Sequence, residues 1–160
     1  MGLNWKGQLD VRDIYIEDHH QDTLIYSKRL VTNILSINNL VQGNLDFGTI
    51  KIYDPKFYLK TYQDEQNDNI SIFANNFVSK TPKKGNVFQL DVNAVNLNNG
   101  KVKIINENLN TSEIFNLSNI FIVTNDLVIK GSTVNIAVKK LSLLAKRGFE
   151  IKNLESDFSY

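Results

Sequence analysis

Short stretches in which apolar and polar residues alternate dominate the chain, and a period of two is typical of β-strands. The apolar stretches are rich in Ile, Val and Phe, which favour strands, and Asn, which favours turns, is frequent between them. Only residues 70–77 have helical spacing, with Ile70, Phe73 and Phe77 on one face and Asp68 or Asn69 as the candidate N-cap. We therefore expect an all-β fold with one short helix.

The apolar positions also recur in a fixed spacing: two residues two apart, a gap of three, then two more residues two apart. A β-bulge in each gap would return both pairs to one face and bend the strand. A row of such bends would curl a mostly antiparallel sheet into a trough, sometimes called a half-pipe. The pattern alone leaves a sandwich equally open, with each pair facing a different layer. The copies are Leu9, Val11, Ile14 and Ile16; Leu45, Phe47, Ile50 and Ile52; Leu90, Val92, Val95 and Leu97; Phe115, Leu117, Ile120 and Ile122; and Ile136, Val138, Leu141 and Leu143.

Three turn signals predict hairpins, and chained hairpins would make an antiparallel meander. The signals are Asn99-Gly100, which would set Leu97 opposite Val102 and Val95 opposite Ile104; Pro55, which would set Ile52 opposite Leu59; and Lys146-Arg147-Gly148, which would set Leu143 opposite Ile151.

Composition narrows the function classes. The 160 residues are 42% hydrophobic and 22% charged, which suits one folded domain or a piece of a longer chain. A net charge of +1 argues against a nucleic-acid partner, and the absence of cysteine excludes disulfides and thiolate metal sites. No apolar stretch approaches the ~20 residues of a membrane helix, and the first residues lack a signal-peptide core.

The two histidines, His19 and His20, lie between two alternating stretches in the sequence EDHHQD. Adjacent residues of a strand point to opposite faces, there is no third His, and no distant carboxylate is an obvious partner. We therefore expect a solvated hairpin loop and no metal site, with a weak metal site as the alternative. Asp64 and Glu65 lie in another polar loop and are interpreted as solvated. Since no catalytic residues or phosphate-binding loop can be identified, we expect no enzyme activity and no cofactor.

Three stretches resemble a known family: IYIEDHHQDTLIYSKRL, LDFGTIKIYDPKFYLKTYQDEQNDNISIF and RGFEIKNLESDFSY. They are similar to the N-terminal periplasmic region of the TamB (translocation and assembly module) family, within the AsmA-like superfamily. The likeness extends from about Leu9 to Tyr160 and rests on the order and number of β patterns, not on one short motif.

This resemblance implies a much longer protein of Gram-negative bacteria, of which residues 1–160 are one β-rich segment. The family is periplasmic and is anchored to the inner membrane by a helix that is absent here. Its body is a curled sheet, a β-taco, with an apolar inner surface and no catalytic residues. It implies a role in outer-membrane protein assembly and in phospholipid transfer between the inner and outer membranes. The expected partners are phospholipid acyl chains and the outer-membrane assembly machinery or its client proteins, with membrane contact through segments outside this chain.

In such a trough, residues from successive strands would form an apolar floor that binds lipid. The alternative is a non-enzymatic β-sandwich or scaffold that holds a polypeptide by strand addition. The residues expected to form the floor are Ile50, Ile52, Val95, Leu97, Val102, Ile104, Ile120, Ile122, Leu141, Leu143 and Ile151.

Overall fold

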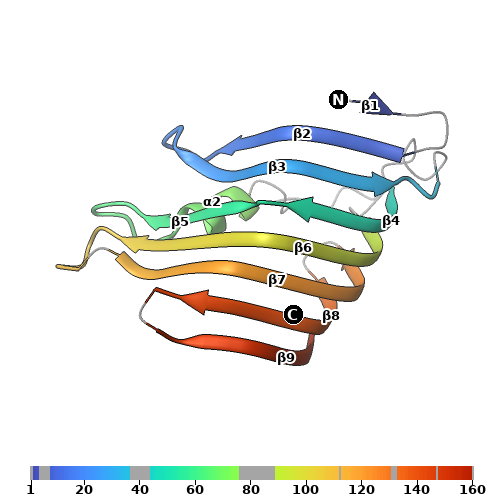
Figure 1. Cartoon of the computed structure of the whole chain (residues 1–160). Helices are drawn as coiled ribbons and strands as arrows, with labels where there is room; N and C mark the ends of the chain where they lie inside the picture. The colour runs from blue at the N-terminus through green and yellow to red at the C-terminus, as the bar shows by residue number, and fades with distance from the viewer. Residues whose placement is uncertain are drawn as a thin grey trace.

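The structure is a computed structural model that describes residues 2–3, 8–36, 44–75, 89–111, 113–130, 133–146 and 148–159. These residues form one curved sheet with one short helix (Figure 1), so the expected fold class is confirmed. The part of the chain described contains no helix with the length and apolarity needed to span a bilayer. The elements are β1 (Gly2–Leu3), β2 (Gln8–Glu17), β3 (Thr23–Asn33), β4 (Asn44–Tyr53), β5 (Lys56–Thr61), α2 (Asn69–Asn75), β6 (Gln89–Asn106), β7 (Glu113–Lys130), β8 (Thr133–Ala145) and β9 (Glu150–Ser159).

The strands follow the order β1-β2-β3-β4-β6-β7-β8-β9, and β5 pairs with both β3 and β6. Neighbours are antiparallel except that β4 and β5 both run parallel to β6. The predicted hairpin at Pro55 is therefore wrong, because β4 and β5 lie end to end like one interrupted strand. Asp54, in the left-handed conformation at φ 49°, makes the break, and the Pro55 carbonyl accepts a hydrogen bond of 2.8 Å from the Lys101 N–H.

The predicted hairpin at Asn99-Gly100 is also wrong, because β6 continues through both residues. Asn99 has the left-handed φ of 56° that a turn would need, but here it bends the strand. Its side-chain amide donates a hydrogen bond of 2.6 Å to the Asp54 carboxylate. Leu97 consequently pairs with Ile122 of β7, not with Val102 of its own strand.

Left-handed residues interrupt several neighbouring strands at about the same level of the sheet. By the register of β2 and β3, Asp13 lies opposite Lys28 of β3. By the register of β3 and β4, the same Lys28 lies opposite Asp54. Asp54 in turn lies beside Asn99, and Asn119 follows on β7. On β2 and β3 the register is the same on both sides of Asp13, so each strand has one unpaired residue and neither has an extra one. Asp13 and Asn119 occupy predicted gaps, and the bends lie together as expected for a curled sheet. The expectation of a β-bulge in every gap is wrong, because the register does not shift at the gaps of β2, β4 and β6; it shifts only near those of β7 and β8.

The third predicted hairpin is confirmed by its pairing. Leu143 lies opposite Ile151, the Ala145 N–H donates to the Phe149 carbonyl at 2.7 Å, and Gly148 has a left-handed φ of 85°. Only glycine adopts that conformation without the steric cost of a Cβ. Arg147, within the predicted loop, lies outside the described residues.

The short helix α2 begins where the sequence predicts. The Asp68 carboxylate accepts a hydrogen bond of 2.7 Å from the Ser71 N–H, which identifies Asp68 as the N-cap. The helix contacts β5, and Ile70 and Phe73 are partly exposed. Phe77, the third residue expected on its apolar face, lies outside the described residues.

Candidate functional site

One face of the sheet carries apolar side chains that lie opposite one another from strand to strand. Directly paired residues project from the same face, so each chain of pairs defines a continuous row. Two such rows cross most of the sheet. The first is Val11, Leu30, Ile52, Leu97, Ile122, Leu141 and Leu154, and the second is Ile16, Ile25, Phe57, Val102, Leu117 and Ala145.

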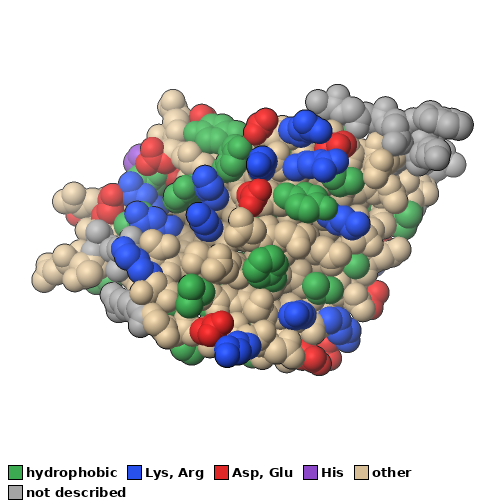
Figure 2. Space-filling model, viewed as in Figure 1, with side chains coloured by type: hydrophobic (Ala, Val, Ile, Leu, Met, Phe, Trp, Pro, Cys, Tyr) green, Lys and Arg blue, Asp and Glu red, His purple; other side chains and the backbone are tan. Residues whose placement is uncertain are grey.

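The opposite face is more polar. Lys51 and Tyr53 flank Ile52 in the sequence, and Lys140 and Ser142 flank Leu141, so they point away from the rows. The face drawn in Figure 2 has Lys, Arg, Asp and Glu spread over it, with hydrophobic side chains in separate small groups. The sheet therefore has an apolar face and a charged face, as the alternation in the sequence predicts.

An open hollow of about 720 Å³ lies on the apolar face where β6 and β8 end and β7 begins. Its volume is within the range of about 300–1,000 Å³ typical of small-molecule pockets. Phe115 and Phe149 are 52% and 60% exposed there, unusual for such large apolar side chains. The main apolar residues of the lining are Ile104, Phe115, Leu117, Leu143, Ala145 and Phe149.

Most of the predicted floor residues belong to the two rows, to two further pairs or to the hollow. Four of them, Ile52, Leu97, Ile122 and Leu141, pair in series along the first row. Ile50 pairs with Val95, Val102 lies in the second row, and Leu143 pairs with Ile151. Ile104 and Leu143 line the hollow. Leu97 and Ile120 are buried and the others are partly exposed.

Several residues that line the hollow are not among the predicted floor residues. Phe115 and Leu117 belong to one copy of the apolar spacing, so the pattern contained the signal to include them. Phe149 lies beside Gly148 in the β8–β9 hairpin, where local sequence gives no indication that it meets the ends of β6 and β7.

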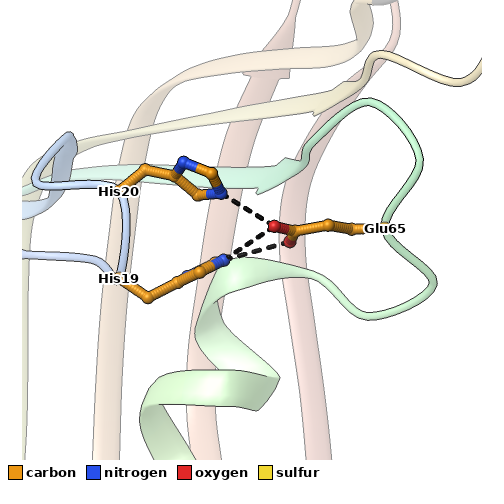
Figure 3. Close-up of side chains that lie close together, drawn as sticks. All are labelled: His19, His20 and Glu65. Atoms are coloured by element: carbon orange, nitrogen blue, oxygen red, sulfur yellow. Dashed lines mark hydrogen bonds and ion pairs between the residues drawn. The ribbon is translucent and has the colours of Figure 1, made fainter.

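A second candidate site lies at the tips of two loops, where both histidines face a carboxylate (Figure 3). His19 Nε2 lies 3.0 Å from Glu65 Oε2, and His20 Nε2 lies 2.7 Å from Glu65 Oε1. The β2–β3 loop is a hairpin loop with exposed histidines, as expected. The expectation that no distant carboxylate meets them, and that Glu65 is merely solvated, is wrong. The two histidines and Glu65, called the His–Glu cluster below, are a group whose ligand atoms could hold a metal ion.

Asp18 is buried, and its hydrogen bonds connect the β2–β3 loop, called the histidine loop below, to the rest of the molecule. Its Oδ1 accepts the N–H groups of His20 and Asp22 at 2.9 and 3.1 Å. Its Oδ2 accepts the Tyr62 hydroxyl at 2.7 Å and the Asn69 amide at 2.8 Å. Burial raises the pKa of this carboxyl, but the hydrogen bonds from Asn69, Tyr62 and the loop backbone outweigh it and leave the pKa below its ordinary value of 3.8.

Tyr62 joins the two loops. Its hydroxyl lies within hydrogen-bond distance of Asp18 and Asp22, and burial together with these carboxylates strongly raises its pKa, so the phenol stays protonated. Its ring centroid is 3.8 Å from that of His20 and 5.5 Å from that of His19. No local sequence signal places Tyr62 beside the histidines, because 42 residues separate it from His20.

Comparison with known proteins adds no family assignment, because neither a protein-family model nor a curated protein matches the chain.

Proposed function

We propose that the apolar face of this sheet binds phospholipid acyl chains, and that the chain is a segment of a TamB/AsmA-like envelope protein. Such a protein would pass phospholipids between the inner and outer membranes and support outer-membrane protein assembly. It would lie in the periplasm, anchored to the inner membrane by a segment outside residues 1–160. The observation that carries the proposal is the pair of apolar rows, which run from strand to strand across the face that opens into the hollow.

Exposure of the hollow is the physical reason to expect an occupant. Each square ångström of apolar surface left in water forgoes roughly 25 cal/mol that burial would recover. Phe115 and Phe149 remain more than half exposed although aromatic side chains gain strongly from burial. An acyl chain would cover them without requiring specific polar partners, because its methylene groups form no hydrogen bonds.

Continuity of the rows favours a long occupant over a compact one. The first row contributes one apolar side chain from each of seven strands: Val11, Leu30, Ile52, Leu97, Ile122, Leu141 and Leu154. A flexible hydrocarbon chain can lie along such a surface, whereas a compact ligand would need an enclosed pocket with placed polar groups. The resemblance of the sequence to a family credited with phospholipid transfer supports the same ligand class.

Photo-crosslinking at matched positions tests the proposal. Leu97 is only 8% exposed, so a probe is better placed at Phe115 of β7 and Leu143 of β8, which line the hollow. Phe121 and Leu144 are the controls, since each lies on the same strand, faces the other side and is 42% or 38% exposed. We expect phospholipid adducts at Phe115 and Leu143 in protein crosslinked in Gram-negative cells, and far fewer at the two controls. Equal labelling of both faces, or no lipid at Phe115 and Leu143, would rule out lipid binding by this segment.

Strand addition by a polypeptide is the second candidate function. Among the described strands β9 pairs only with β8, so its other edge presents backbone groups that a partner strand could use. Lys152, Glu155 and Asp157 along β9 count against it, because charges on an edge strand discourage such pairing. A photo-crosslinker at Glu155 that captures protein, with no lipid at Phe115, would favour this function over the first.

A further inference from the structure

We propose that His19, His20 and Glu65 form a binding site for a divalent transition-metal ion, with Zn²⁺ as the best match. The ligand atoms are the two imidazole Nε2 atoms and a carboxylate oxygen, and they lie within 4.8 Å of one another. Two imidazoles with one carboxylate suit zinc and its neighbours in the first transition row, whereas calcium and magnesium prefer oxygen ligands alone. This site is independent of the apolar face and of any lipid bound there.

The distances suit a metal after a small adjustment. Zinc binds imidazole nitrogen at about 2.0–2.1 Å and carboxylate oxygen at about 2.0–2.2 Å, so neighbouring ligand atoms of a tetrahedral site lie about 3.3–3.5 Å apart. Measured to Glu65 Oε1, the nitrogen-to-oxygen distances are 3.2 Å for His19 and 2.7 Å for His20. All three ligand atoms lie within 4.8 Å of one another, so side-chain rotation that replaces the hydrogen bonds by bonds to the ion would complete the site.

Both imidazoles are held in place before any ion arrives. The Tyr62 ring packs beside both, and Figure 3 shows both Nε2 atoms turned toward the Glu65 carboxylate. The backbone of the histidine loop is fixed by the hydrogen bond from the His20 N–H to Asp18. A site whose ligands are already oriented loses less conformational entropy when it binds.

Glu65 is positioned from the other side by the loop that follows β5. Its N–H donates to the Tyr62 carbonyl at 3.1 Å, and its own carbonyl accepts the Asn108 side-chain amide at 2.9 Å. Asp64, the preceding residue, is in the left-handed conformation at φ 65°, and its N–H donates to the Asn108 side chain at 2.8 Å. Glu65 is therefore anchored to the end of β6 independently of the histidines.

Charged groups also contact the Tyr62 side chain that packs beside the cluster. The Tyr62 hydroxyl donates to Asp18 and Asp22, and the Lys60 ammonium, which pairs with Asp22 and Glu107, lies 4.1 Å from the Tyr62 ring centroid. Together with Glu65, the carboxylates outnumber this cation. The Glu65 carboxylate itself faces both imidazoles.

The site would keep at least one coordination position open to water. Three protein ligands leave a tetrahedral zinc ion one ligand short, and the side chains of His19, His20 and Glu65 are 28%, 46% and 28% exposed. The ion would also join the β2–β3 loop to the loop after β5, segments about 45 residues apart in the sequence. Since it binds only the folded arrangement, it would stabilise this end of the sheet.

Titration of the chelator-treated chain with Zn²⁺, followed by calorimetry, tests the site. We expect one ion per chain, and a Co²⁺-loaded sample with the visible absorption of a four-coordinate ion. Glu65→Gln should weaken Zn²⁺ binding at least about tenfold, because loss of even an outer-shell partner typically costs that much. Asp64→Asn makes the same change of charge one residue away and should leave binding unchanged.

Thermal unfolding gives a second readout. At the same concentration, Zn²⁺ should raise the midpoint of the wild-type chain and of Asp64→Asn by more than that of Glu65→Gln. Circular dichroism verifies that each variant keeps the strand spectrum, and His20→Asn replaces Glu65→Gln if the latter does not fold. Absence of saturable binding by the wild-type chain, or equal affinity in the wild type and the ligand variant, would overturn the proposal.

Discussion

Replacement of Asn69 by alanine should destabilise the protein more than a change at any exposed asparagine. Asn69 is the first residue of α2 and is 1% exposed. Its Oδ1 accepts the Lys60 N–H at 2.9 Å, and its amide donates to the Tyr58 carbonyl at 3.0 Å and to Asp18 at 2.8 Å. The first two bonds occupy backbone groups of β5 just beyond its pairing with β3, so the side chain replaces a neighbouring strand there.

The magnitude follows from the three hydrogen bonds. Each neutral bond to the β5 backbone contributes about 1 kcal/mol net, and the bond to the Asp18 carboxylate contributes about 1.5–3 kcal/mol. Asn69→Ala should therefore lower the free energy of unfolding by about 4 kcal/mol. For a chain of this size, about 2–4 °C of melting temperature corresponds to each kcal/mol, so the midpoint should fall by about 8–16 °C.

Urea denaturation followed by circular dichroism measures the change, with Asn67→Ala as the control. Asn67 is exposed in the same loop, so its replacement removes the same amide without breaking those bonds. The control should stay within about 0.5 kcal/mol of the wild type. A loss below about 1 kcal/mol for Asn69→Ala would refute the view that this side chain joins α2, β5 and the histidine loop.

Three further predictions concern pH, backbone packing and the helix. Hydrogen bonds depress the folded-state pKa of Asp18, so its contribution to stability is present above the ordinary value of 3.8 and is lost as the pH falls through the lower folded-state pKa. In urea denaturation between about pH 7 and pH 2, Asp18→Asn should therefore lose less stability on acidification than the wild type. Parallel curves of stability against pH for the two proteins would contradict this. Gly100→Ala should lower the free energy of unfolding by about 1–3 kcal/mol, because the added Cβ would lie 2.6 Å from a Leu97 methyl. Gly48→Ala is the control, since its Cβ would meet only contacts of 3.5 Å or more. Equal melting temperatures for the two variants would argue against the prediction. Phe73→Ala should cost about 1–3 kcal/mol in urea denaturation, less than the 3–5 kcal/mol of a fully buried phenylalanine, because the side chain is partly exposed; a change below about 0.5 kcal/mol would mean that α2 does not depend on this contact.

Local sequence determined the features that depend only on residues close together in the chain. Alternation identified the apolar face, Asp68 marked the beginning of the helix, and Gly148 marked a hairpin that only its left-handed conformation allows. The spacing of apolar pairs located bends such as those at Asp13 and Asn119, where a short polar side chain tolerates positive φ.

Long-range pairing decided the features that the sequence analysis missed. Asn99-Gly100 satisfies the backbone requirements of a tight turn and of a bend within a long strand equally well. The local sequence therefore could not show that β6 continues through the bend, between β4 and β5 on one side and β7 on the other. Pro55 was ambiguous for the same reason, since its fixed φ suits both a turn and a break between two aligned strands.

The His–Glu cluster depends entirely on tertiary structure. The sequence drew attention to His19 and His20, but nothing near them in the chain points to Glu65, about 45 residues away. The two loops meet because β5 pairs in register with both β3 and β6, and because Asp18, Tyr62 and Asn69 hydrogen-bond across the space between them. A local pattern can specify which way a side chain points, but only the register of the whole sheet determines which distant side chain it meets.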